Sequence, residues 1–267
     1  MDRRIASTRK AACALGLAVA LAGAASAQNA APAPSPQPLS KSCQTGNATL
    51  AEDFPLPNVA TALKERKTLR ILAMGAAPGR VTRHGGSYTD VIEAMLQGAL
   101  KGINVVVINR GISGELASNA AVRMKIEVAL DDPDLVLWQV GTNDALAFVP
   151  VESFIATVRD QIAWLRAHKV DVVLVGLQFA PEMLREAHYV ELREQLRKLA
   201  AQEKVIIIRF FEAMQIIKQA TAQEPVSEQF ERDEAGYNCL AQYVARAITL
   251  GTFAKGGLPN REPTPPK

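Results

Sequence analysis

Five short runs of apolar, largely β-branched residues alternate with longer segments of helical periodicity along the chain. Each run is apolar almost throughout, which is typical of strands buried on both faces of a parallel sheet. Strands are predicted at Leu69–Met74, Ile103–Ile108, Leu135–Val140, Val170–Val175 and Val205–Arg209. Helices are predicted at Ser87–Lys101, Glu115–Ala129, Val151–His168, Ala187–Gln202 and Asp233–Leu250, the first with an N-terminal cap from Ser87 and Asp90. The pattern predicts an α/β fold, a three-layer α/β/α sandwich around a five-stranded parallel sheet.

The first 27 residues have the pattern of a secretory signal peptide. Arg3, Arg4, Arg9 and Lys10 precede an apolar stretch, and Ala25-Ser26-Ala27 supplies the small residues of a cleavage site. We expect cleavage after Ala27, a periplasmic or secreted protein, and no stable membrane insertion afterwards. An uncleaved N-terminal anchor is the alternative, although the stretch is shorter than the roughly 20 apolar residues of a membrane span.

Proline-rich segments border a single predicted domain. Residues 28–42 form an Ala/Pro-rich linker, residues 256–267 form a disordered tail, and residues 43–255 form the domain. Cys43 and Cys239 are the two cysteines beyond the signal peptide. In an oxidising compartment they are candidates for a disulfide, and two buried free thiols are the alternative.

The basic balance of the chain lies in the signal peptide. The formal charge of +3 is the charge of residues 1–27, so the remaining chain is neutral. A neutral mature protein has no electrostatic footprint for nucleic acid, and we expect no nucleic-acid partner.

Glycine and polar residues follow the first three predicted strands, where the ligand crevice of an open parallel sheet lies. Gly75-Ala-Ala-Pro-Gly79 follows the first strand, Asn109-Arg-Gly-Ile-Ser-Gly114 the second and Gly141-Thr-Asn-Asp144 the third. No GxGxxG or GxxxxGK[ST] sequence is present, and the three histidines have no metal-ligand spacing. No cofactor and no metal are therefore predicted.

In order and placement, these blocks resemble those of the SGNH (GDSL-type) hydrolase family, in particular its exported bacterial esterase-like branch. The resemblance covers about residues 68–250 and implies a flavodoxin-like SGNH fold. It implies that the Gly111 amide and the Asn143 side chain are oxyanion donors, and that Gly75 and Asp144 lie beside them. The segment 233–237, Asp-Glu-Ala-Gly-Tyr, resembles the turn that opens the last helix of the family, just after its catalytic Asp-x-x-His.

The catalytic positions of the family are not conserved in residue type. The nucleophilic serine corresponds to Ala77, the aspartate to Glu228 and the histidine to Glu231. No serine or threonine occurs in residues 75–79, and no histidine follows His188. Because acyl transfer by this route needs a hydroxyl nucleophile and a base, no intact catalytic triad is expected.

The other site residues each have a structural interpretation that stays open at this stage. Gly111 is either an oxyanion donor or a residue that permits a tight turn, and Asn143 either binds a ligand or bonds neighbouring backbone. Asp144 is either solvated or clasps the turn after the first strand. Glu228 and Glu231 also fit as acidic residues before a helix N-terminus.

Three hypotheses follow for the function. The first is an exported pseudoenzyme that binds a small-molecule acyl or carbohydrate-ester ligand. The second is an active hydrolase with a carboxylate-based mechanism, in which Asp144, Glu228 or Glu231 activates water. The third is an interaction or scaffold protein of the cell envelope.

Overall fold

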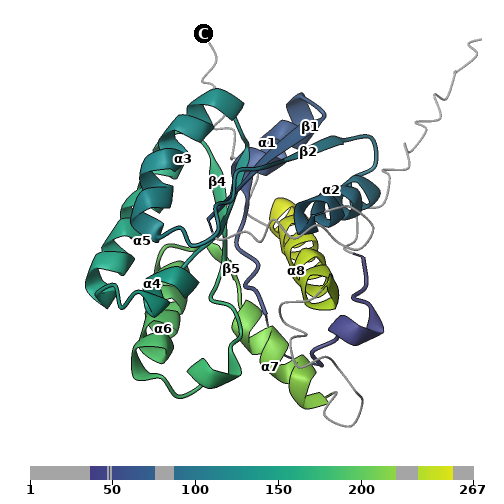
Figure 1. Cartoon of the computed structure of the whole chain (residues 1–267). Coiled ribbons are helices and arrows are strands. Elements are labelled where there is room, and N and C mark those ends of the chain that lie inside the picture. Colours follow the sequence, from purple (N-terminus) through teal and green to yellow (C-terminus); the bar gives the residue numbers. More distant parts are fainter. Residues whose placement is uncertain (1–36, 47, 49, 76–86, 221–233, 255–267) are drawn as a thin grey trace, which may run out of the picture. The chain divides into compact units, whose positions relative to one another are not determined.

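A five-stranded parallel sheet forms the centre of the computed structural model (Figure 1), which describes residues 37–46, 48, 50–75, 87–220 and 234–254. The strands follow the spatial order β2-β1-β3-β4-β5, and every neighbouring pair is parallel. Their bounds are Thr68–Gly75 (β1), Asn104–Asn109 (β2), Leu135–Gln139 (β3), Asp171–Val175 (β4) and Ile206–Ile208 (β5). The predicted five-stranded α/β fold is confirmed.

Helices cover both faces of the sheet. One face carries α1 (Pro57–Glu65), α2 (Tyr88–Ala99) and α8 (Glu234–Phe253), and the opposite face carries α3 (Ala117–Asp131), α5 (Val151–Ala167) and α6 (Ala187–Gln202) (Figure 1). Every residue of β3 and β4 is buried because both faces are covered, which explains why these strands are continuously apolar. The three-layer arrangement is the one predicted.

Five further elements were not predicted. They are the helices α1, α4 (Thr142–Leu146) and α7 (Phe210–Ala220) and two single 3-10 turns, Lys41–Cys43 and Pro181–Met183. In contrast, the cap of α2 is as expected, because Ser87 Oγ accepts the Asp90 amide and the Asp90 carboxylate accepts the Ser87 amide.

The two ends of the described chain are joined. Cys43 and Cys239 form a disulfide with their Cα atoms 5.2 Å apart, and both residues are buried. The bond attaches the segment that precedes α1 to helix α8. Among the described residues, no helix has both the length and the apolar character needed to cross a membrane.

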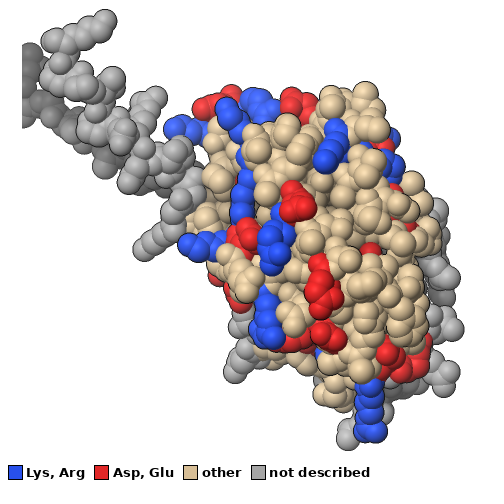
Figure 2. Space-filling model, turned by 90° about the vertical axis from the view of Figure 1, so that its left-hand side faces the viewer, with Lys and Arg blue, Asp and Glu red and all other residues tan. Residues whose placement is uncertain are grey.

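Acidic and basic side chains are intermixed on the outer face of α3, α5 and α6 (Figure 2). Arg166 pairs with Glu203, and Arg197 pairs with Glu194 three residues earlier on the same helix. Because opposite charges alternate, this face has no extended area of one sign.

Candidate functional site

The predicted site lies at the edge of the sheet where the strands end, called here the carboxyl edge. The residues Gly75, Gly111, Asn143 and Asp144 all follow or end strands at this edge. Ala77, Glu228 and Glu231 lie outside the described residues. The geometry of the site therefore concerns the first four.

Gly75 ends β1 with a backbone conformation that favours glycine. Its φ angle is 86°, and a Cβ atom there would lie 1.9 Å from the carbonyl oxygen of Gln139 on β3. No side chain fits at that distance, so glycine is required where β1 turns away beside β3. The role shown by the structure is close backbone approach.

Gly111 uses its amide within its own loop. The Gly111 N–H donates to the side-chain oxygen of Asn109 at 2.9 Å. On either side, the Arg110 amide donates to Ala73 and the Ile112 amide donates to Gly75, so this loop continues along β1. The donor that the resemblance assigns to an oxyanion is thus engaged with a neighbouring side chain.

Asn143 holds the loop between β2 and α3. It lies on α4, is half-buried, and donates from Nδ2 to the carbonyl oxygen of Glu115 at 3.0 Å. This is the backbone bond that the sequence left as one of two interpretations. An amide nitrogen carries two hydrogens, so one donor of Asn143 has no partner in the described part of the chain.

Asp144 lies on α4 and caps the N-terminus of α3. Its side chain accepts the amide of Ala117, the first residue of α3, at 2.9 Å. Of the two interpretations left open, the solvated carboxylate is excluded, because Asp144 is only 2% exposed. Burial raises the pKa of Asp144, against hydrogen bonds from backbone amides that lower it. The turn after β1, the other predicted partner, lies outside the described residues.

A partly buried ion pair between this loop and α3 had no signal in the sequence. Arg123 contacts the Glu115 carboxylate through two bonds of 2.9 and 2.8 Å, and the Glu115 side chain is 5% exposed. Arg123 also pairs with Glu127 one turn later. The ion pair with Arg123 holds Glu115 in place. Because the Glu115 carbonyl accepts the hydrogen bond from Asn143, the pair positions Asn143 indirectly.

Of the described histidines, His188 lies at the carboxyl edge. His188 is in the first turn of α6, and its ring stacks on Phe148 with centroids 5.5 Å apart. His84 lies outside the described residues. His168 stacks instead on Trp164 at the end of α5. Among described residues, no group of three His, Cys, Asp or Glu side chains could hold a metal ion.

A family model and two esterases match this chain in sequence. The model of the Non-GDSL lipase-like family matches residues 42–253. Esterase TesA of Pseudomonas aeruginosa is 29% identical over 121 residues, which are 44% of this chain and 59% of that protein. An arylesterase of Vibrio mimicus is 28% identical over 111 residues, which are 41% of this chain and 54% of that protein. The chain thus spans just over half the length of these relatives.

Solved structures share the fold. A variant of an acetyl-xylooligosaccharide esterase from Geobacillus superposes with a TM-score of 0.56 and 17% identity, covering 67% of this chain and 94% of that one. At this identity, the likeness concerns the arrangement of the sheet and helices.

Proposed function

Because the chain belongs to the Non-GDSL lipase-like family of SGNH-type proteins, we propose that it is an exported pseudoenzyme that binds an acyl or carbohydrate-ester ligand at its carboxyl edge. The observation that carries this proposal is alanine at position 77, where the family motif has its nucleophile. Alanine has no lone pair to attack a carbonyl carbon. A carboxylate base at Glu231 would have no hydroxyl to activate.

The engaged donors at the carboxyl edge support the same proposal. Stabilising a tetrahedral oxyanion needs preorganised donors aimed at it. The Gly111 amide is bonded to Asn109, and Asn143 has given one of its two hydrogens to Glu115. One remaining amide hydrogen can bond a ligand carbonyl oxygen, but it does not make up the set of preorganised donors that an oxyanion needs.

Asp144 is a poor candidate for the carboxylate-based alternative. One of its oxygens is bonded to the N-terminus of α3, and the side chain is almost completely buried. A general base must be within reach of the water that it activates. That alternative therefore depends on Glu228 and Glu231 alone, and no described contact favours it.

The ligand class rests on the relatives. The matched proteins are an esterase and an arylesterase, and the structural neighbour is an acetyl-xylooligosaccharide esterase. An acyl ester, free or on a carbohydrate, is the chemistry that these names share. We propose that this chain retained recognition of such a group.

Export is part of the proposal and has two supports. Residues 1–27 have the signal-peptide pattern, and Cys43 forms a disulfide with Cys239. Disulfides persist in oxidising compartments. Expression of the full chain in a bacterial host, followed by fractionation, should recover a protein beginning at Gln28 outside the cytoplasm. An unprocessed cytoplasmic protein would contradict export.

Hydrolysis assays test the loss of catalysis. The wild-type protein should not turn over p-nitrophenyl acetate, and Ala77→Ser should stay inactive because no imidazole activates the new hydroxyl. Ala77→Ser combined with Glu228→Asp and Glu231→His should gain slight activity. Turnover by the wild type that is lost in Asn143→Ala would refute the pseudoenzyme.

Binding of an acetylated xylo-oligosaccharide, measured by calorimetry, tests the retained recognition. Asn143→Ala should weaken binding because it removes the remaining donor. Asn119→Ala is a matched control, since Asn119 is exposed on α3 and its side chain forms no hydrogen bond in the described structure. Equal affinity in both variants would exclude Asn143 from the ligand site.

A further inference from the structure

A second cavity lies away from the carboxyl edge, between the 38–53 segment and α8. Its volume is about 460 Å³, within the range of small-ligand sites. Its apolar lining includes Leu39, Leu50 and Leu250, and its polar lining includes Thr45, Asp53 and Arg246. None of the described site residues Gly75, Gly111, Asn143 and Asp144 contributes to it.

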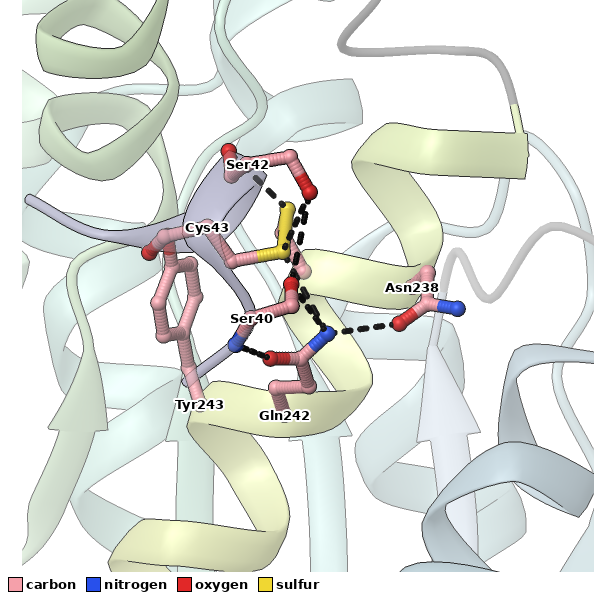
Figure 3. The surroundings of a disulfide bond; sticks show 7 residues. Ser40, Ser42, Cys43, Asn238, Gln242 and Tyr243 are labelled. Carbon is pink, nitrogen blue, oxygen red and sulfur yellow. Dashed lines mark hydrogen bonds between the residues drawn. A yellow bond between two sulfur atoms is a disulfide. The ribbon is translucent and has the colours of Figure 1, made fainter. Parts of the chain in front are cut away.

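The walls of this cavity are fixed in position. The disulfide joins Cys43 to α8, and Tyr243 on α8 donates its hydroxyl to the Cys43 carbonyl at 2.6 Å (Figure 3). The Ser40 amide donates to Gln242 Oε1 at 2.7 Å, and Gln242 Nε2 donates back to Ser40 Oγ. A segment attached covalently and by hydrogen bonds cannot simply collapse onto the helix.

The far end of the segment is attached as well. The Leu56 amide donates to the carbonyl of Gly251 on α8, and the Arg209 amide donates to the carbonyl of Leu50. With both ends held, the cavity between them exists before any ligand arrives. Preorganisation of this kind lowers the entropic cost of binding.

The charged residues of the lining indicate which chemical groups a ligand would carry. Arg246 is the cation and Asp53 the anion among the lining residues, and both are exposed. In the described structure, neither side chain forms a hydrogen bond or an ion pair with another residue. A guanidinium can bind a carboxylate, and a carboxylate can bind an ammonium group. A lining that combines aliphatic side chains with one cation and one anion suits an apolar molecule that carries both charges.

We propose that this cavity binds a short apolar peptide with free termini. The peptide carboxylate pairs with Arg246, its ammonium group pairs with Asp53, and its aliphatic side chains contact the three leucines. The site is separate from the ester-ligand site, so either proposal stands without the other.

Titration of the isotope-labelled full chain with the dipeptide Leu-Leu, followed by NMR, tests the proposal. Saturable shift changes are expected in Gln44–Gly46 and Tyr243–Leu250. Ala48→Trp should abolish them by filling the cavity from an exposed position on its wall. An unchanged thermal midpoint would show that this variant is folded.

Modified peptides and charge variants separate the two ion pairs. Because exposed pairs contribute little, Arg246→Gln should weaken Leu-Leu binding by about two- to fivefold and leave binding of Leu-Leu amide unchanged. Asp53→Asn should weaken Leu-Leu by a similar factor and leave N-acetyl-Leu-Leu unchanged. Arg185→Gln, at an exposed arginine outside the cavity, should have no effect.

Three outcomes would overturn the proposal. They are the absence of saturable shifts up to about 10 mM peptide, equal affinity in the wild type and the two charge variants, and shifts centred on the carboxyl edge. Binding that persists in Asn143→Ala would show that the cavity is independent of the ester-ligand site.

Discussion

Replacing Cys43 and Cys239 together by alanine is expected to lower the free energy of unfolding by about 3–5 kcal/mol. The disulfide closes a loop between residues 196 apart in the sequence. For a loop of that length, the chain-entropy relation gives a stabilisation of about 5 kcal/mol, and measured values usually fall below it. A loss of this size should lower the melting temperature by roughly 10 °C in a domain of this length.

Thermal and urea unfolding, followed by far-ultraviolet circular dichroism, measure this loss. The reduced wild type should match the double variant, and reductant should not change the variant further. Because both cysteines are buried, reduction needs prior unfolding in urea. Ser42→Ala, at an exposed neighbour, should stay within about 0.5 kcal/mol of the wild type. A double variant as stable as the wild type would refute the reasoning.

Three further predictions concern the free energy of unfolding. Gly75→Ala should cost more than about 3 kcal/mol because the new Cβ would clash with the backbone of β3. Gly102→Ala, at a position with φ 77° and open space, should cost about 1 kcal/mol. Equal costs of the two variants in urea unfolding would contradict this. Burial raises the pKa of Asp171 to about 6, so its stabilising contribution is complete below about pH 4 and lost as the pH rises through 6. A carboxyl carbon NMR titration with a midpoint below 4 would disprove that shift. Arg123→Met should cost about 2 kcal/mol because it leaves the Glu115 carboxylate unpaired, and a loss below about 0.5 kcal/mol would show the pair to be unimportant.

The strands could be predicted because a strand that is buried on both faces is apolar almost throughout its length. The predicted range Leu135–Val140 differs from β3 by one residue, and Ile103–Ile108 is shifted by one residue from β2. The long helices could be predicted equally well. Helix α6 has the predicted bounds, and α5 differs from its prediction by one residue.

Helix α1, which was not predicted, takes its N-terminal cap from a distant strand. It begins after Leu56, which has no capping side chain, and the Asp171 carboxylate accepts the amides of Asn58 and Val59. Helix α3 also begins after a leucine and is capped by Asp144 from α4. A local capping pattern such as that of α2 is readable in sequence, and a long-range cap is not.

The sequence by itself determined which residue types stand at each position. No serine or threonine occurs in residues 75–79, and no histidine follows His188, whatever the fold of these segments. The tertiary structure alone decided what Gly111, Asn143 and Asp144 bond to. A hydrogen bond requires donor and acceptor within about 3 Å and in line. Only the folded chain brings such groups together, so residue type shows what a side chain can bond and tertiary contacts decide what it does bond.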